Sequence, residues 1–413
     1  MIGSRTGAQE VQHMPLDLQP GDVYAGNIRI HRVLGTGSFA HVYEVETPGY
    51  PERLALKLTR EPVSSGEQAQ RALREITILR SLTNPHVVRT FDCGLRPDGH
   101  IYLLMDLLYG QTLEQEHRFD EPLDPVRAVT IVHQACLGLA EAHAMGVVHR
   151  DVKPENVFIE HDGKVKMLDF GLARSWDGSP VVGIDASESH LIVGTPHYSQ
   201  PEQLRTRVLT PASDVYSLAT ILYELLTART PFFPQTPLPA LREELRHKPT
   251  EWLRAHARRP AVPLDRCPGG EGLPDSLVRG VARALDKDPD KRPPNAGAFA
   301  NVLGLVLHRD MGIHVAAKLR VLNPDDTVVE RLFLPGSYRI GSGRRCEIKL
   351  RDDSVPRVHA VLEWGGTPGR PHLRPLHDDG SVKVNDRVVH TAVELGREDE
   401  FSVGSTRMAV VTG

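Results

Sequence analysis

Three patterns of hydrophobic and polar positions follow one another along the 413 residues. The first part alternates short apolar runs with turns, which predicts β-strands around one segment of helical spacing. The middle part repeats apolar residues at helical spacing and predicts helices with an apolar face. The last part, from about 313 to 413, returns to short alternating runs between Gly, Asp and Pro turns. That pattern is typical of a β-sandwich of roughly a hundred residues.

Segments between and before these elements have compositions of their own. Residues 1–23 mix Gly, Gln, Pro and polar side chains without periodicity and are expected to form a flexible leader. Residues 233–274 are rich in Pro, Arg and His and are expected to form helix and loop. The apolar runs predict strands at 28–47, 54–57 and 101–105, a hairpin of 157–159 with 165–168, and helices over 66–82, 125–145, 213–226 and 295–307.

The stretch 149–171, which reads HRDVKPENVFIEHDGKVKMLDFG, gathers the groups of a phosphoryl-transfer site. Asp151 stands beside the cation of Lys153 and the amide of Asn156, and a second carboxylate, Asp169, opens an Asp-Phe-Gly turn. Phosphoryl transfer needs little covalent help from the protein. It needs an oriented nucleophile and divalent metal that neutralises charge. The alternative, chance tripeptides in an ordinary domain, does not account for all of these groups in register.

Composition narrows the remaining classes of protein. Hydrophobic residues make up 40%, enough for the cores of two or three domains, and the net charge of -4 gives no general electrostatic reason to bind nucleic acid or an acidic membrane. No apolar run approaches the roughly 20 residues of a transmembrane helix, and the N-terminus lacks an apolar secretion segment. The cysteines have neither metal-ligand nor paired spacing, which favours a reduced, cytoplasmic protein. They are Cys93, Cys136, Cys267 and Cys346.

The stretch 149–171 resembles the catalytic loop and metal-binding loop of eukaryotic-type (Hanks-type) bacterial serine/threonine protein kinases. The resemblance covers about 24–308 and implies an α+β, two-lobed kinase fold that binds ATP with Mg²⁺ or Mn²⁺. It implies that Asp151 orients the substrate hydroxyl, that Asn156 and Asp169 hold metal, and that Lys153 stabilises the transferred group. Lysine at that position is the choice of serine/threonine kinases, so the acceptor is expected to be a Ser or Thr hydroxyl.

The same resemblance assigns an ATP site to the first part of the chain. Gly35 and Gly37 match a glycine-rich loop, where a Cβ would obstruct the turn or the ligand, although Ala40 replaces the third glycine. Lys57 and Glu75 match the ion pair that positions the phosphates, whereas Glu75 alone would be interpreted as a solvated helix charge. The adenine pocket is expected to use Val42, Ala55, the gatekeeper Met105, and the backbone of Asp106 and Leu108.

Residues 169–202 resemble the activation segment of these kinases. Thr195, in the closing pattern GTPHYSQPE, is implied to contact the catalytic aspartate and lysine and to help position the substrate. The middle of the segment has the polarity of a loop that phosphorylation orders, or of one whose serines only keep it soluble. The residues concerned are Ser187 and Ser189 as phosphorylation sites, and Arg150 and Arg174 as receivers of the phosphate.

Three further residues are implied to support the site. Asp214 resembles the buried aspartate that braces the catalytic loop, although by sequence alone it could equally be an acid at a helix N-terminus. Glu202 is expected to pair with Arg292. Such a buried pair is fragile, because removal of one partner leaves the other charge unpaired.

The segments 338–341, 346–350, 357–360 and 384–385, followed by Gly404, have an order and spacing that resemble those of a forkhead-associated domain. This resemblance implies that residues 313–413 form an all-β sandwich, of a family that binds phosphothreonine peptides through loops at one end. Three positions depart from that family: Ser342 replaces its arginine, Pro356 replaces its phosphate-binding serine, and Asp379 stands in place of its later asparagine. An anionic Asp379 would repel phosphate, and His359 is implied to be structural. A degenerate protein-interaction domain is therefore favoured over phosphothreonine binding. The cations available as replacements are Arg344, Arg345 and Arg357.

The expected partners are protein substrates with Ser or Thr acceptors, and a phosphoprotein or docking partner of the C-terminal domain, with no nucleic acid and no membrane insertion. One rival is a catalytically silent kinase-fold scaffold, which would be expected to lack Lys57, Asp151 or Asp169. Another is a kinase that acts on a small molecule, and the closing segment 194–202 favours protein substrates instead.

Overall fold

The contacts of the chain divide the computed structural model into two compact units. The first unit contains a small β-rich lobe, and the second contains a large helical lobe together with the C-terminal sandwich. The described residues are 17–25, 27–37, 40–62, 77–96, 98–170, 196–204, 209–313, 317–325, 327–334, 336–343, 346–350, 352, 355–364, 370–396 and 399–411. Most of the predicted leader therefore lies outside them.

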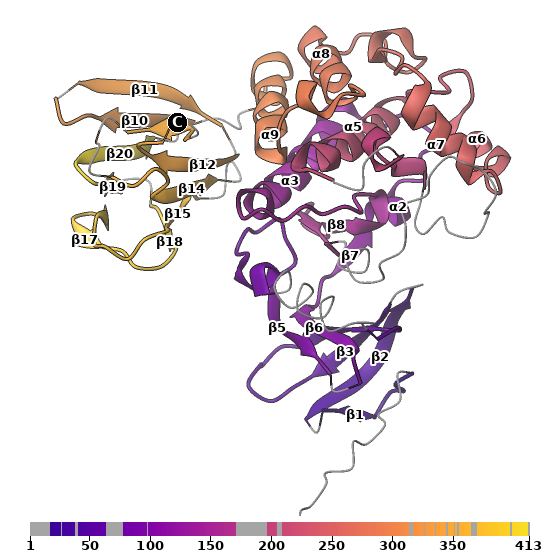
Figure 1. Ribbon diagram of the computed structural model, residues 1–413, viewed down its shortest axis with the longest axis horizontal. Helices are drawn as coiled ribbons and strands as arrows, with labels where there is room; N and C mark the ends of the chain where they lie inside the picture. The colour runs from indigo at the N-terminus through magenta and orange to yellow at the C-terminus, as the bar shows by residue number, and fades with distance from the viewer. Residues whose placement is uncertain are drawn as a thin grey trace, which may run out of the picture. The chain divides into compact units, whose positions relative to one another are not determined.

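The small lobe is an antiparallel sheet whose strands are ordered β1-β2-β3-β4-β6-β5 (Figure 1). Tyr43, Leu56 and Leu104 come from neighbouring strands and belong to its buried core. Residues 77–81 are helical, and the earlier part of the predicted helix lies outside the described residues. The strands are β1 (Val23–Tyr24), β2 (Ile28–Thr36), β3 (Ala40–Glu46), β4 (Leu54–Thr59), β5 (Thr90–Leu95) and β6 (Ile101–Asp106).

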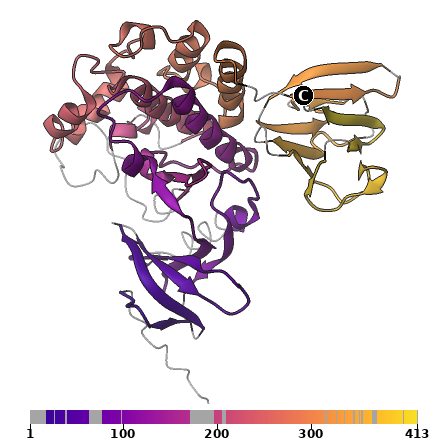
Figure 2. The same cartoon turned by 180° about the vertical axis from the view of Figure 1, so that it is seen from behind.

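Helix α3 (Pro125–Ala144) is the centre of the large lobe, where α5 (Pro211–Thr227) and α9 (Ala296–Leu305) pack against it (Figures 1 and 2). Asp124 caps the start of α3 by accepting the Arg127 N–H. The predicted helix over 125–145 is thus present. The other helices and turns are α2 (Leu113–Glu116), η1 (Pro154–Asn156), η2 (Pro196–Tyr198), η3 (Pro201–Leu204), α6 (Leu238–Glu244), α7 (Pro249–Arg258), η4 (Leu264–Arg266), α8 (Asp275–Ala284) and η5 (Pro289–Lys291).

Two sequence expectations for the large lobe can be compared directly with the structure. The predicted hairpin forms from β8 (Val157–Glu160) and β9 (Val165–Met167), and β7 (Gly110–Thr112) pairs beside β8. Helix α5 was predicted to begin at Ser213, but it begins two residues earlier at Pro211. Proline fits the first helical position, and the Ser213 hydroxyl accepts the Thr210 N–H at 3.0 Å, so the helix starts one residue after Thr210.

The C-terminal region is a sandwich of two sheets, as predicted. One sheet has the strand order β11-β10-β20-β19-β16-β17 and the other the order β13-β12-β14-β15-β18, with a buried core formed by residues of both (Figure 1). The strands are β10 (Ala317–Leu322), β11 (Val328–Phe333), β12 (Gly336–Gly341), β13 (Ile348–Lys349), β14 (Ala360–Trp364), β15 (His372–Pro375), β16 (Val382–Val384), β17 (Arg387–Val388), β18 (Val393–Glu394), β19 (Glu400–Val403) and β20 (Thr406–Val411).

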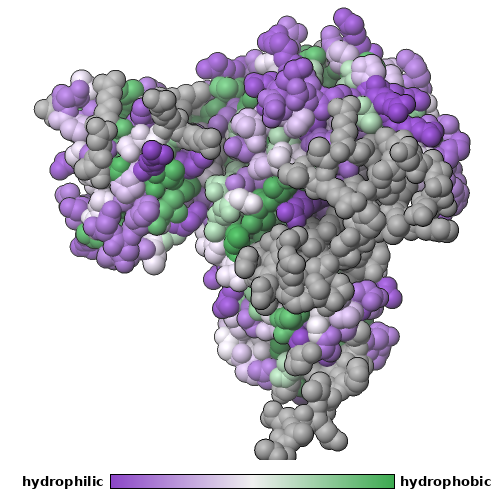
Figure 3. Space-filling model, in the orientation of Figure 1, coloured by the Kyte–Doolittle hydropathy of each residue, from purple (hydrophilic) through white to green (hydrophobic). Residues whose placement is uncertain are grey.

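Helix α9 ends in a wider turn before the chain enters the sandwich. This π-helical segment, η6 (Val306–Asp310), closes with a hydrogen bond from the Met311 N–H to the Val306 carbonyl at 3.0 Å. On the face drawn in Figure 3, hydrophilic residues predominate over the helices of the large lobe. No helix in the described ranges is long and apolar enough to cross a membrane. None of the four cysteines forms a disulfide.

Candidate active site

One buried carboxylate, Asp214 of α5, binds the backbone of the catalytic loop. Its oxygens accept the backbone N–H of His149 at 2.7 Å and of Arg150 at 3.0 Å, and His143 of α3 lies 2.8 Å away. Burial alone would raise the pKa of Asp214, but the hydrogen bond and charge of His143 bring it below its ordinary value. Asp214 is fully buried and ionised, so it is a brace and not simply an acid at a helix start.

His149 adds a second connection between the catalytic loop and the segment after the hairpin. Its Nε2 lies 2.7 Å from the Leu168 carbonyl oxygen, and its ring contacts the Phe170 ring in a tilted arrangement with centroids 4.8 Å apart. Burial lowers the pKa of His149, which keeps the ring neutral. Arg150 has a left-handed backbone with φ of 67°, which turns the chain toward Asp151.

The side chain of Asp151 lies between a cation and an amide. Lys153 Nζ is 2.9 Å from Asp151 Oδ2, and Asn156 Nδ2 donates to the Asp151 carbonyl at 2.7 Å and to Oδ2 at 3.2 Å. The carboxylate therefore has a fixed orientation while remaining about one-fifth exposed. An oriented, accessible carboxylate can accept a proton from a hydroxyl placed against it.

Asn156 and Asp169 are suited to hold Mg²⁺ together with phosphate oxygens. The amide nitrogen of Asn156 is used by Asp151, which directs the amide oxygen elsewhere, and the Leu168 N–H binds the Asn156 carbonyl at 2.9 Å. Asp169 is exposed at the end of the hairpin, with a left-handed φ of 46°. No group of three His, Cys, Asp or Glu side chains among the described residues could hold a metal. Few protein oxygens are what Mg²⁺ requires, because it keeps waters and binds phosphates.

In the small lobe, five of the predicted ATP-binding residues share one face of the sheet. Gly35 pairs with Val42, Val42 with Lys57, and Ala55 with Met105. Paired residues of an antiparallel sheet point to the same face, as do residues two apart along a strand. Tyr43, Leu56 and Leu104 of the core occupy the intervening positions and so face the other way.

The structure changes the explanation of why positions 35 and 37 are glycine. A Cβ at Gly35 would meet nothing within 4 Å, and one at Gly37 only the Ala40 carbonyl at 3.6 Å. The expectation that a Cβ would obstruct the turn is therefore wrong, and only the ligand argument remains. Farther along, the Asp106 N–H donates to the Arg89 carbonyl at 3.0 Å, so a contact from Asp106 to adenine would use its carbonyl oxygen. Leu108 follows in the half-buried segment after β6.

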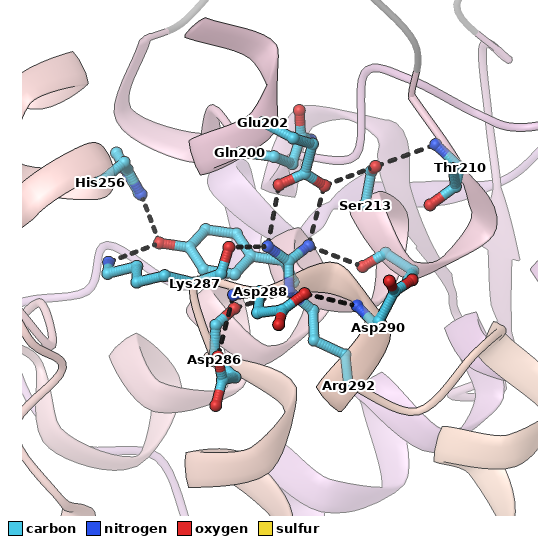
Figure 4. A network of polar contacts seen from close by, with 12 residues as sticks. Gln200, Glu202, Thr210, Ser213, His256, Asp286, Lys287, Asp288, Asp290 and Arg292 are labelled. Atoms are coloured by element: carbon cyan, nitrogen blue, oxygen red, sulfur yellow. Dashed lines mark hydrogen bonds and ion pairs between the residues drawn. The ribbon is translucent and has the colours of Figure 1, made fainter. Parts of the chain in front are cut away.

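Glu202 and Arg292 lie together in the interior of the large lobe (Figure 4). Two parallel hydrogen bonds of 2.8 Å join the guanidinium to the carboxylate, and Ser213 donates to Glu202 at 2.6 Å. Burial raises the pKa of Glu202, but Arg292 outweighs that effect and the pKa is lowered overall. Arg292 Nε also donates to the Asp286 carbonyl at 2.7 Å. The pair connects the end of the activation segment to the segment before α9.

The sequence did not indicate a second polar cluster at the end of the activation segment. Glu224 of α5 lies 2.6 Å from His197 Nε2 and accepts the Tyr198 hydroxyl at 2.9 Å. His197 is stacked on Tyr198 and on Trp252 of α7, with ring centroids 4.3 and 4.1 Å apart. The nearest sequence signal was a glutamate within the apolar repeat of α5. Its partners come from distant segments, so no local pattern identified them.

Several predicted site residues lie outside the described residues. In the kinase region these are Glu75, Arg174, Ser187, Ser189 and Thr195, and in the C-terminal region Arg344 and Arg345. Their roles therefore stay predictions. Arg357 is described and exposed.

At the loop end of the C-terminal sandwich, the three departing residues are engaged in internal contacts. Ser342 Oγ donates to the Val355 carbonyl at 2.7 Å, and its N–H donates to the Pro356 carbonyl at 3.2 Å. Asp379 accepts the Ser381 hydroxyl at 2.6 Å and N–H at 3.0 Å, and these bonds lower its pKa. Buried His359 contacts Ser381 and lies 3.4 Å from Asp379. The carboxylate of Asp379 is therefore held in place by Ser381 and lies beside His359.

The family model of the protein kinase domain matches residues 28–302, and that of the FHA (forkhead-associated) domain matches residues 338–404. The chain therefore belongs to the protein kinase family and carries an FHA domain after the kinase domain, in the order the sequence predicted.

Individual relatives match to different extents. The chain is 32% identical over 273 residues to the serine/threonine-protein kinase PrkC of Bacillus subtilis, covering 66% of this chain but 39% of PrkC. It is 36% identical over 385 residues to the serine/threonine-protein kinase PkaB of Streptomyces coelicolor, covering 91% of this chain and 81% of PkaB. The crystal structure of the Mycobacterium tuberculosis PknI kinase domain matches at 26% identity over 69% of this chain and 98% of that one, with a TM-score of 0.49.

Proposed function

We propose that this protein is a serine/threonine protein kinase that transfers the γ-phosphoryl group of ATP to Ser or Thr hydroxyls of protein substrates. We assign the kinase domain to 24–308 and the interaction domain to 313–413. The need for ATP and the four cysteines, none of which forms a disulfide, favour the cytoplasm as the site of action.

One observation carries this proposal: Asp151 is oriented by Lys153 at 2.9 Å and by Asn156 at 3.2 Å while its carboxylate stays accessible. In the proposed reaction the Asp151 carboxylate accepts the proton of the substrate hydroxyl, whose oxygen bonds to the γ-phosphorus of ATP. The bond from that phosphorus to the β–γ bridging oxygen breaks, and ADP leaves with the bonding electrons. Lys153 stabilises negative charge on the transferred group. The brace of Asp214 keeps the loop in place, so little reorganisation accompanies the transfer.

Divalent metal, when bound, neutralises the charge of the phosphates. Asn156 and Asp169 would hold it through their side-chain oxygens. Gly35 and Gly37 would admit the phosphates close to the backbone, and Lys57 would bind them with Glu75 as its ion-pair partner. Val42, Ala55 and Met105 would cover the adenine, and the backbone of Asp106 and Leu108 would bind its edge. Thr195 would help to position the substrate.

The test replaces Asp151 by Asn in the full chain. Turnover of labelled ATP onto casein, and onto a copy of the chain that carries Lys57→Met, is expected to fall roughly 10³-fold, because general-base catalysis contributes about 10²–10⁴-fold. Asp162→Asn, in the exposed hairpin turn, is the matched control and is expected to keep full turnover.

Each result has a distinct meaning. Full turnover in a well-folded Asp151→Asn protein would refute the role of Asp151. A wild-type chain that binds ATP but transfers nothing to any acceptor would favour the scaffold instead.

For the C-terminal domain, we propose an interaction domain that does not bind phosphothreonine in the usual mode. The support is the fixed, anionic Asp379, together with the internal contacts of Ser342 and Pro356. Regulation by phosphorylation of Ser187 and Ser189, with Arg150 and Arg174 as receivers, stays a prediction. Replacing both serines by Ala is expected to lower turnover on a separate protein substrate.

A further inference from the structure

Strand β14 of the FHA domain is buried on both of its faces. Ala360, Leu362 and Trp364 belong to the core between the sheets, whereas Val361 and Glu363 point to the opposite face and are 3% and 7% exposed. The outer face of a sandwich sheet is ordinarily solvated and polar. A buried carboxylate on that face indicates that something covers it.

The surface that covers this sheet belongs to the large lobe. Strand β12, next to β14, contacts both α3 and α9. Tyr338 packs against the core between the sheets, and its hydroxyl reaches Asn301 Oδ1 at 3.4 Å. Leu334, just before β12, lies against Gly304, where a Cβ would be 3.7 Å from the leucine Cβ. These two contacts therefore lie beside the outer face and not on it. The α3–α9 surface is defined here by Glu141, Asn301 and Gly304.

An ion pair joins the two domains at the centre of this contact. Arg374 Nη2 of β15 is 3.4 Å from Glu141 Oε1 of α3, and Glu141 is completely buried. The other oxygen of Glu141 accepts the Asn84 N–H at 2.9 Å within the lobe. A buried carboxylate is expensive without compensation, and here part of the compensation comes from the FHA domain.

Glu363 lies beside the same pair. Burial and the charge of Glu141 raise the pKa of Glu363 to about 7, while Arg374 and the Ser337 hydroxyl oppose that rise. On the neighbouring strand β15, His372 is the residue paired with Glu363. The contact thus brings together two carboxyl groups and an arginine, and a proton on Glu363 relieves the repulsion between the carboxyls.

The α3–α9 surface is connected to the catalytic loop by a short set of hydrogen bonds. Glu141 is two residues before His143, which lies 2.8 Å from Asp214 and accepts the Ala296 N–H of α9 at 3.1 Å. Asp214 in turn holds His149 and Arg150. The helices that seat the FHA domain therefore also position the brace of the catalytic loop.

We propose that the α3–α9 surface is a regulatory docking site whose ligand is this chain's own FHA domain, held by Arg374 against Glu141, and that release of the domain loosens the brace under the catalytic loop. The effect on turnover rests on the proposed kinase function. Docking itself does not, and it is measured separately.

The first experiment follows hydrogen exchange of peptides from α3 and β14 in the full chain. Arg374→Gln is expected to raise exchange in both peptides at least 10-fold, because Glu141 is left without that cation. The double variant Glu141→Gln/Arg374→Gln is expected to recover part of the protection. Arg370→Gln is the matched control, since Arg370 is exposed and pairs with exposed Glu394. Equal exchange in Arg374→Gln and Arg370→Gln would overturn the docking.

Asn301→Lys tests the same contact from the catalytic side and leaves the FHA domain unaltered. It is expected to raise exchange in β14 and to lower turnover several-fold, in step with Arg374→Gln. Turnover that stays at the wild-type level while β14 exchanges freely would overturn the regulatory part. If the wild-type chain transfers no phosphate, the exchange results still decide the docking.

The raised pKa of Glu363 makes docking depend on pH, which a contact without a titrating group would not do. The docked carboxyl of Glu363 keeps its proton up to about pH 7, whereas a released one ionises near 4.3, so docking is strongest at low pH and weakens as pH rises through 7. Between pH 6 and 8, docking is expected to weaken about 10-fold. Glu363→Gln is expected to remove this dependence, and an unchanged profile in that variant would contradict the assignment.

Discussion

The catalytic loop and the loop end of the FHA domain are supported in the same way, by a buried side chain beneath a turn. Asp214 holds the backbone of the catalytic loop, and His359 contacts the Ser381–Asp379 turn. The residues on top differ. Above Asp214, the carboxylate of Asp151 is oriented and accessible. Near His359, the Asp379 carboxylate accepts hydrogen bonds from Ser381, and we propose that its charge opposes the binding of phosphate.

This difference shows that the support of a site and its chemistry are separable. Gly341 and Gly343 still allow the backbone to approach closely, because a Cβ at either would lie within 2.6 Å of the Arg357 carbonyl oxygen. The fold itself requires the absence of a Cβ at these two positions. Nothing in the fold requires an arginine at position 342 or a serine at 356, because the sandwich forms with Ser342 and Pro356 at these positions.

The largest expected effect comes from breaking the buried pair in the catalytic region. Arg292→Gln leaves the buried carboxylate of Glu202 without its cation, so the free energy of unfolding of the large lobe is expected to fall by about 3–5 kcal/mol. Arg339→Gln is the counterpart in the sandwich, where Arg339 and Glu347 are each about one-third exposed, and about 1 kcal/mol or less is expected. Hydrogen exchange of peptides from each region measures both. Equal losses would contradict the contrast in burial.

A second prediction uses pH to separate the regions. Burial lowers the pKa of His86 in the large lobe to about 4, so the folded lobe binds fewer protons than the unfolded chain between pH 6.5 and 4. This contribution to stability is complete above pH 6.5 and is lost as pH falls through 4, by roughly 3 kcal/mol. Exchange of α3 and β9 amides at pH 7, 5.5 and 4.5 measures it.

Variants of two histidines test the cause of that slope. His86→Gln is expected to remove most of the loss of stability between pH 6.5 and 4. His161→Gln, in the exposed hairpin turn, is expected to leave that loss unchanged. A slope that persists in His86→Gln would assign the acid sensitivity to other groups, such as buried His256, whose pKa is lowered to about 3.

The smallest effect is expected when the phosphate-binding and peptide-binding residues typical of the family are restored in the FHA domain. In a full chain inactivated by Asp151→Asn, a phosphothreonine peptide and its unphosphorylated form are expected to bind equally weakly. Adding Ser342→Arg, Pro356→Ser and Asp379→Asn is expected to favour the phosphorylated peptide about 10-fold, or about 1.4 kcal/mol. Fluorescence anisotropy measures both. Phosphate-dependent binding before these changes would mean that Arg357 has replaced the lost ligands.

The fold could be predicted from the sequence because each element carries a local pattern. The apolar repeat of α3, the hairpin around Gly163 and the short runs of the sandwich all depend on neighbouring residues. The catalytic motif was equally local, since Asp151, Lys153 and Asn156 lie within six positions.

Contacts between distant segments could not be predicted in this way. Glu141 has the local sequence of an ordinary helix charge, and its partner Arg374 is 233 positions away on another domain. The two N–H donors and the histidine around Asp214 likewise come from separate segments. The start of α5 differs from the prediction for a local reason, because Pro211 fits the first helical position and the Thr210 N–H donates to the Ser213 hydroxyl.

The π-helical turn η6 also determines where a chimaera of this chain can be joined. Such a turn holds one residue more than an α-helical turn, and in an α-helix each residue rotates the direction of the chain by about 100°. Removing a residue between Val306 and Asp310 would therefore convert η6 to a regular α-helical turn and change the direction in which the chain continues to the FHA domain. Chimaeras that exchange the terminal domain are expected to retain the parental geometry when spliced after Asp310, and to lose it when the joint falls inside the turn.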